Sequence, residues 1–457
     1  FGEAWVKNRP VEVVQTIFWG SDFNSGVGRI VTMAALSGIL GILAWLSFLL
    51  SVLWFGAKPI ITKAAEHKEY PAFLSTFVGV LFLVIMELIY VPDTVVGVAL
   101  FMAVGLLLAM MVNIGLTKKI SFNLFDNPKL GFVSSLLIVI LIVGVVAMSY
   151  GVFTKLLGAY QFNRGYAKQV VGDLQGAEML YKRALKNNEI DQYYRGLVDV
   201  NLVKMRQLLS AKDADPKLAE KFKEMLATAF DSGRKATEIG PTNYLNWVSL
   251  GMVGEFVVPL KQIQGAYDLA VNSYTKVKEL NATSPIGQMR MARLDIAAGN
   301  VDKAKLDLLE AIKIKSNFTE ALFLLSQIEA SKGNLAAAID KVDQAALFSP
   351  NDVGVLFQQG FLKYSKKDYK GAVAALERAV TINNQYSNAR YFLGLSYAQL
   401  DQQQAAIDQF VEIAKYNSDN EEVKTILENL RAGRQPFEGS KETAPEKRSK
   451  LPVKEEK

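Results

Sequence analysis

The sequence predicts an all-α protein in which four transmembrane helices are followed by an α-solenoid of about seven helical hairpins. Two observations support this fold class. The first third of the chain contains four apolar runs, each of about 20 residues or more, which is the length that crosses a bilayer. Further on, alanines recur at a constant spacing of 34 residues, a period typical of stacked helical repeats: Ala270, Ala304, Ala338, Ala372 and Ala406.

Residues 1–28 precede the apolar runs and are too polar to span a bilayer. They are rich in aromatic residues, among them Trp5 and Trp19. Tryptophan favours the boundary between membrane and water. We therefore expect an extracytoplasmic loop that lies at the membrane surface, although an ordinary connecting loop fits the same composition.

The apolar runs predict a transmembrane region over residues 29–156. A helix of about 20 residues crosses a hydrocarbon core about 30 Å thick. Each run reaches that length; the runs cover residues 30–55, 72–91, 94–116 and 131–153. The lipid bilayer is thus the first partner that the sequence predicts.

The orientation follows from the lysines in the short connections, because lysine and arginine are enriched in cytoplasmic loops. The turn at residues 91–93 has no basic residue, whereas the other two connections contain Lys58, Lys63, Lys68, Lys118, Lys119 and Lys129. We therefore expect these two connections in the cytoplasm. Residues 1–28 and the whole chain after Tyr150 would then lie outside it.

The same local pattern surrounds each alanine of the ladder. In one copy, Gly333-Asn334 forms a turn before Ala338, apolar residues follow at Val342 and Ala345, and Pro350 stops the helix. Apolar residues at positions i, i+4 and i+7 indicate one face of a helix. We expect the alanine at the point where two helix backbones cross, because a larger side chain would hold them apart.

Two less regular copies lie closer to the membrane, around Ala177 and Ala229. The steps from Ala177 to Ala229 and from Ala229 to Ala270 are 52 and 41 residues, both longer than the regular 34. The extra residues predict lengthened helices or loops in this part. Together the copies predict a solenoid over residues 157–433.

This pattern resembles the tetratricopeptide repeat (TPR) family, whose small first-helix residue corresponds to Gly360 and Gly394. The resemblance implies a concave groove that binds a protein or peptide partner. In that family the fifth and ninth positions of each first helix line the groove; here they are Met289, Arg293, Phe323, Phe357, Phe361 and Tyr391. These residues predict an apolar or aromatic partner, although a buried core shows the same stripe.

Residues 434–457 follow the last repeat and combine mixed charge with few large apolar residues. Such a segment buries too little apolar surface to offset the entropy lost on ordering. The composition therefore predicts a disordered charged tail.

The composition also restricts the chemistry. The chain has no cysteine and one histidine, His67, which argues against disulfides, cysteine nucleophiles, a metal site and a cofactor. The net charge of +6 comes without basic clusters, so we expect no nucleic-acid partner. The sequence starts at Phe1 without a signal-peptide pattern, and we expect it to be the C-terminal part of a longer protein.

Three charged residues near the apolar runs are candidates for substrate binding. Glu87 lies inside a run, where a charge is costly and is often kept for function, although it is near enough to the outer face to reach headgroup water. Arg9 and Arg29 lie in or beside the outer loop, where guanidinium groups would bind a lipid-linked pyrophosphate through paired hydrogen bonds. Arg29 also fits the role of an interfacial anchor.

The membrane part resembles the C-terminal half of an O-antigen ligase or polymerase-like protein. The resemblance is carried by Phe18-Trp19, Asp22-Phe23-Asn24-Ser25-Gly26 and the helix that opens with residues 36–43. It implies a protein of the bacterial inner (plasma) membrane that joins glycans carried on undecaprenyl pyrophosphate. Where that family has a His-Asn pair, this sequence reads Asn24-Ser25-Gly26-Val27-Gly28-Arg29, which leaves the catalytic residues unknown and enzymatic activity open.

The sequence therefore predicts a membrane-anchored, extracytoplasmic repeat protein that belongs to the assembly of cell-envelope polysaccharide. Two alternatives fit the same features. One is a non-catalytic scaffold whose transmembrane helices only anchor the repeats. The other is a secretion or export component whose groove takes peptide cargo.

Overall fold

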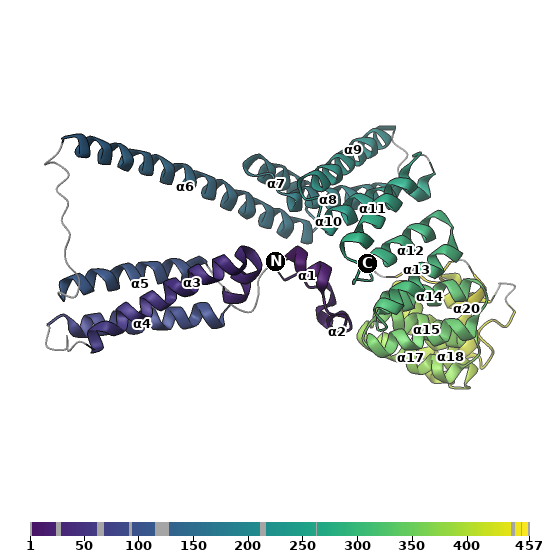
Figure 1. Cartoon of the computed structure of the whole chain (residues 1–457). Coiled ribbons are helices and arrows are strands. Elements are labelled where there is room, and N and C mark those ends of the chain that lie inside the picture. Colours follow the sequence, from purple (N-terminus) through teal and green to yellow (C-terminus); the bar gives the residue numbers. More distant parts are fainter. Residues whose placement is uncertain are drawn as a thin grey trace. The chain divides into compact units, whose positions relative to one another are not determined.

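A computed structural model describes residues 2–23, 29–61, 68–90, 94–114, 128–210, 216–261, 263–439, 444–448 and 450–455. All regular secondary structure in these ranges is helical, which confirms the predicted all-α class. The chain forms two compact units (Figure 1). The first comprises Phe1–Arg9, Gly20–Asp213 and Glu238–Asn243; the second comprises Pro10–Trp19, Ala214–Thr237 and Tyr244–Lys457.

The first unit contains the long apolar helices and the start of the repeat region. Its helices are α1 (Gly2–Asn8), α3 (Arg29–Ile61), α4 (Tyr70–Ile89), α5 (Thr94–Asn113), α6 (Pro128–Val170), α7 (Leu174–Asn187) and α8 (Asp191–Ser210). In the described residues, four segments are long and apolar enough to cross a membrane: Leu36–Ile60, Tyr70–Ile89, Val95–Asn113 and Gly131–Val170. They match the four runs that the sequence analysis marks as transmembrane.

Helices α3, α4 and α5 pack against one another around an apolar interior. Phe73, Val80 and Leu100 are fully buried in it. Helices α3 and α4 approach closely at Gly56, where an added Cβ would lie 2.0 Å from the ring of Phe77. Small residues that let helix backbones approach are typical of packing between membrane helices.

The outward faces of these helices are as apolar as their interior. Large side chains such as Ile39, Phe82 and Met102 are more than half exposed. In α6 an exposed stretch without any polar side chain runs from residue 136 to residue 148. Exposed apolar surface of this extent marks contact with a membrane or a partner, because water disfavours it.

Helix α3 bends at Gly38. This residue has φ of 64° and ψ of −164°, far from helical values. A positive φ costs glycine little because it has no Cβ. The bend falls inside residues 36–43, the stretch that carries the resemblance to ligases.

Helix α6 belongs to both the apolar part and the repeats. It runs for 43 residues, a length of about 65 Å, without a break. Its last three turns pack on α7: Phe162 lies 5.1 Å from Tyr181 between ring centroids, and an added Cβ on Gly165 would lie 2.7 Å from the same tyrosine. The end of α6 is therefore the first helix of the first hairpin.

The second unit contains the rest of the solenoid. Its helices are α2 (Val11–Val14), α9 (Pro216–Ile239), α10 (Tyr244–Val257), α11 (Ala266–Leu280), α12 (Ile286–Ala298), α13 (Val301–Ile314), α14 (Thr319–Ser331), α15 (Leu335–Phe348), α16 (Val353–Ser365), α17 (Tyr369–Ile382), α18 (Ser387–Gln399), α19 (Gln403–Tyr416) and α20 (Glu421–Arg431). Three short 3-10 turns accompany them: η1 (Ile17–Gly20) follows α2, η3 (Val258–Leu260) lies between α10 and α11, and η4 (Pro445–Lys447) follows α20. Successive helices from α10 to α20 pack as antiparallel neighbours, as Figure 1 shows in teal to yellow.

The alanine ladder lies at the centre of this packing, as predicted. All seven alanines are fully buried: Ala177, Ala229, Ala270, Ala304, Ala338, Ala372 and Ala406. The residue four positions on fills the space against the first helix of the same hairpin. A Cβ added to Gly360 would lie 2.4 Å from the Leu376 side chain, and a Cβ added to Gly394 would lie 2.7 Å from the Phe410 ring. The pairing of a small residue with a bulky one therefore sets the distance between the two helices.

The turn inside each hairpin needs a residue in the left-handed region. Gly299 and Gly333 supply it with φ of 82° and 79°. In later repeats Lys367 and Asp401 adopt φ of 67° and 60° at the equivalent place. The following helix then begins at a polar cap; Asp368, for example, accepts a hydrogen bond of 3.0 Å from the Gly371 amide.

The two irregular steps of the ladder correspond to longer helices. Helix α8 has 20 residues and α9 has 24, whereas α13, α15, α17 and α19 have 14 each. This confirms the prediction of lengthened helices around Ala229. The second irregular step adds η3 and the turn before α11.

Within the tail 434–457, the described residues 434–439, 444–448 and 450–455 include side chains that pack and form hydrogen bonds, unlike the disordered segment that composition predicts. Val453 is 6% exposed and belongs to the core of the last repeats, and Phe437 packs against the same core. Hydrogen bonds from Asn429 reach the carbonyls of Pro436 and Glu438 at 3.2 and 3.0 Å. Specific contacts with asparagine side chains compensate for the low apolar content of this segment.

Replacing Ala338 by leucine should destabilise the solenoid, because the added atoms have no space between the crossing backbones. Overpacking of this kind typically costs about 1–3 kcal/mol. We expect a lower urea midpoint of the far-ultraviolet circular dichroism signal. The control is Ala337→Leu, in the same helix but exposed. Equal midpoints for the two variants would contradict the crossing role of Ala338.

Candidate functional site

The predicted groove positions lie on the first helices of four hairpins, but most of them are buried. Met289 is 3% exposed, Phe357 8% and Tyr391 0%. The spacing selects one face of the first helices, and three of the four fifth positions on that face are buried. Phe323 on α14 is half-buried and is the fifth position that a partner can reach.

The two ninth positions are more accessible. Arg293 is exposed and forms an ion pair with Glu320 across neighbouring hairpins. Phe361 is half-buried and stacks on Phe357 with ring centroids 6.1 Å apart. A partner in the groove would therefore meet Phe323, Phe361 and the Arg293 guanidinium.

The buried Tyr391 hydroxyl joins two helices at the C-terminal end of this face. The Tyr391 hydroxyl donates to the carboxylate of Glu422 on α20. Burial, and then this hydrogen bond to a carboxylate, raises the pKa of Tyr391 well above its ordinary value. Tyr391 is thus a neutral donor at all physiological pH values, and it fixes α18 against α20.

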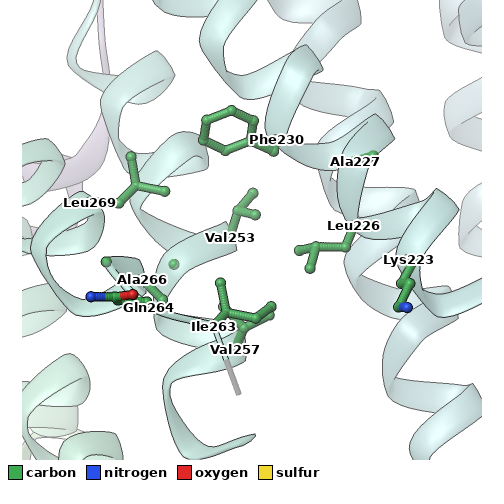
Figure 2. Close-up of a pocket in the computed structure, with 12 residues that line it drawn as sticks. Lys223, Leu226, Ala227, Phe230, Val253, Val257, Ile263, Gln264, Ala266 and Leu269 are labelled. Atoms are coloured by element: carbon green, nitrogen blue, oxygen red, sulfur yellow. The ribbon is translucent and has the colours of Figure 1, made fainter. Parts of the chain in front are cut away.

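A pocket that the sequence analysis missed lies between α9, α10 and α11 (Figure 2). Its volume is about 500 Å³. Leu226, Val253 and Ile263 point into the same space in Figure 2, and Lys223 supplies a charge on one wall. The pocket fits an apolar group of small-ligand or side-chain size. The only sequence signal for it is the irregular step of 41 residues between Ala229 and Ala270, which brings Ile263 and Gly265 into the wall.

Residues 10–19 of the outer loop bind the turn between α13 and α14. Gln15 Nε2 donates to the Ile314 carbonyl at 2.8 Å, and Gln15 Oε1 accepts from the Ser316 amide at 3.2 Å and from its hydroxyl at 3.1 Å. Asn317 Nδ2 donates to the Gln15 carbonyl at 2.9 Å. One glutamine side chain thus pairs with both the donors and the acceptors of the turn.

A lysine and two aromatic rings complete this contact. Lys315 is 5% exposed, and its Nζ donates to the Val14 carbonyl at 2.9 Å. Burial lowers the pKa of Lys315 from its ordinary value. Trp19 packs edge-on against Phe318 with ring centroids 5.3 Å apart. We call residues 10–19 together with residues 314–318 the loop–repeat contact.

Arg9 is held inside the first unit. Its side chain is 1% exposed and forms an ion pair of 2.8 Å with Asp22. The guanidinium also lies 5.9 Å from the centroid of Trp5, whose ring packs edge-on against Phe23. In this arrangement the Arg9 guanidinium binds a carboxylate of the protein, which is the kind of group that the predicted pyrophosphate would replace.

The other two candidates are Glu87 and Arg29, which lie on two of the apolar helices. Glu87 lies on α4 and is 1% exposed among the apolar residues of the helix bundle. Arg29 is the first residue of α3, but its side chain lies outside the described residues, as do Asn24 to Gly28, which replace the ligase His-Asn pair.

Comparison with protein families identifies the repeats. Residues 289–352 and 353–386 match models of the tetratricopeptide repeat. The C-terminal region therefore contains TPR repeats, as its 34-residue spacing predicts. No curated protein matches the chain.

Several solved structures are similar to the chain. The crystal structure of MamA is 19% identical over 34% of this chain and 91% of its own, with a TM-score of 0.31. YrrB, described as a TPR protein with an unusual peptide-binding site, is 14% identical over 41% of this chain and 93% of its own, with a TM-score of 0.34. Yeast Tom70 is 14% identical over 88% of each chain, with a TM-score of 0.44.

Proposed function

We propose that this chain is a membrane-anchored TPR protein whose solenoid binds a protein or peptide partner outside the cytoplasm. The four apolar helices serve as the anchor. Their length and their exposed apolar faces support this role. The TPR repeats supply the binding surface, since stacked helical hairpins form extended concave faces suited to partners.

The observation that carries the proposal is the loop–repeat contact. Gln15 precedes all four apolar helices, whereas Ser316 follows them, and the two residues are hydrogen-bonded. A contact between them requires both to be on the same side of a membrane. The chain between them must then cross the bilayer an even number of times, and four spanning helices meet that condition.

The lysines in the connections indicate on which side of the membrane the solenoid lies. Lys58 and Lys68 lie at the connection between the first and second apolar helices, and Lys129 lies at the connection between the third and fourth. All three lysines are exposed. Lys63, Lys118 and Lys119, which carry the same argument, lie outside the described residues. Because lysine is enriched in cytoplasmic connections, these residues support a solenoid outside the cytoplasm.

The chemistry of the partner follows from the reachable groove residues. Phe323 and Phe361 offer aromatic surface, and Arg293 offers a cation that is already paired with Glu320. A partner segment with apolar or aromatic side chains would bury the two rings. The apolar pocket beside α9 adds a second place where one apolar group fits.

Single cysteines should report the side of each segment, because the chain has no cysteine of its own. In spheroplasts, a membrane-impermeant maleimide should label Lys313→Cys, whose native side chain is 81% exposed on the solenoid. Lys68→Cys and Lys129→Cys should be labelled only after the membrane is permeabilised. Labelling of the two connections from outside, with Lys313→Cys protected, would contradict the proposed topology.

Photo-crosslinking should locate the partner on the groove. Benzoylphenylalanine in place of Phe323 should give a crosslinked species in cells, because this ring lies on the reachable groove face. The control is the same group at Leu347, which is 77% exposed on α15, a second helix of its hairpin. Crosslinks of equal yield at both positions, or at Leu347 alone, would argue against partner binding in the groove.

Glycan assembly is the second candidate function. The cluster of Arg9, Asp22, Trp5 and Phe23 favours it, since a cation beside two aromatic rings suits a lipid-linked pyrophosphate at the membrane surface. To act in this way, the Arg9 guanidinium would have to exchange Asp22 for the phosphate. The ligase or polymerase activity thus requires a rearrangement that partner binding does not require, and we rank it second.

A further inference from the structure

The end of the chain lies along the first helices of the last repeats. Turn η4 packs against α16, and residues 450–455 contact the start of α18 and the turn before α20. Pro445 and Val453 are buried there. The tail therefore crosses three successive first helices, which is the path that a bound peptide takes along a solenoid groove.

Three asparagine side chains hold the backbone of the tail. Asn388 Nδ2 donates to the Val453 carbonyl at 3.0 Å, and Asn388 Oδ1 accepts from the Val453 amide at 3.3 Å. Asn417 pairs in the same two-way manner with Lys454, at 3.2 and 3.0 Å. Asn420 Nδ2 donates to the Pro452 carbonyl at 3.0 Å. These hydrogen bonds involve only main-chain atoms of the tail, so an extended segment of another sequence could form them too.

A carboxylate on the tail binds the N-terminus of α18. Glu455 accepts hydrogen bonds from the amides of Ser387 at 2.8 Å and Asn388 at 3.0 Å, and from the Asn388 side chain. Amides at a helix N-terminus favour an anion because they have no partner within the helix. Burial, and then the nearby Glu455 charge, raises the pKa of Tyr386 to about 12.

The tail also contacts the residue that holds Tyr391, one of the predicted groove positions. Arg448 forms an ion pair of 2.6 Å with Glu422, the residue that accepts the Tyr391 hydroxyl. Asn388 and Asn417 are 1% and 2% exposed with the tail in place. A partner could use this part of the groove only after the tail leaves it.

We propose that residues 448–455 are an intramolecular ligand of a peptide-binding cleft formed by Asn388, Asn417, Asn420 and the first turn of α18. The external ligand of this cleft is an extended peptide with an aliphatic residue two positions before a carboxylate, as in Val453-Lys454-Glu455. This inference rests on the proposed partner-binding function and adds a specific cleft and its regulation. The tail acts as a tethered competitor, because an intramolecular ligand has an effective concentration of the order of mM.

The experiment measures whether the tail of the chain competes with an added tail peptide for the cleft. The probe is a fluorescein-labelled peptide with the sequence of residues 448–457, and the protein is the full chain in detergent micelles. In the variant Val453→Asp/Glu455→Lys the tail loses its buried side chain and its carboxylate, so the cleft should be empty. We expect fluorescence anisotropy to give at least tenfold tighter probe binding to this variant than to the native chain.

Two controls make the result specific. Lys450→Ala changes an exposed tail residue and should bind the probe as weakly as the native chain. Adding Asn388→Ala to the released variant should reverse the gain, because it removes the two-way backbone pairing. A probe in which the residue equivalent to Glu455 is lysine should bind the released variant at least tenfold more weakly than the native probe.

Two results would overturn the inference. If the released variant binds the probe no more tightly than the native chain, residues 448–455 only cover the last repeat. If the same substitutions convert a dimer into a monomer in light scattering, the occupant of the cleft is the tail of a second copy. Neither result affects the topology or the Phe323 crosslink, so the proposed function would stand or fall separately.

Discussion

The hydrogen bonds between Gln15 and the turn from α13 to α14 constrain the rest of the molecule. They join residues 301 positions apart, one before and one after all the apolar helices. The glutamine amide pairs with both a carbonyl and an amide of the turn, and Lys315 is buried on the Val14 carbonyl. If the apolar helices cross a membrane, this contact requires an even number of crossings. It also requires the solenoid residues of the contact to lie on the same side of the membrane as residues 10–19.

Helix α6 provides the second constraint, since it is continuous from the exposed apolar stretch into the first hairpin. The first hairpin is oriented by α6 through Phe162 and Gly165. At the other end of the array, Asn388 and Glu455 bind the tail to the last repeats, which makes the groove there available only in exchange for that tail.

The sequence could predict the parts of the fold in which a local residue pattern is repeated along the chain. The 34-residue ladder and the four apolar runs each give a repeated local signal, and both correspond to observed helices. Counting helix positions selects one face of the first helices, but it does not show which residues of that face are covered, and Met289 and Tyr391 are buried. The tail and the loop–repeat contact had no local signal, because an asparagine or glutamine that binds a distant backbone looks like any polar residue. Gln15 and Asn388 are such cases.

The most direct test of this account joins the two sides of the loop–repeat contact. In the cysteine-free chain, Gln15→Cys and Ser316→Cys together should be joined by a short bismaleimide in intact membranes, since the native side chains are 3.1 Å apart at their hydrogen-bonded oxygens. The pair Gln15→Cys and Lys129→Cys should not react, because the proposed topology puts these two residues on opposite sides of the bilayer. A crosslink in the second pair without one in the first would contradict the account.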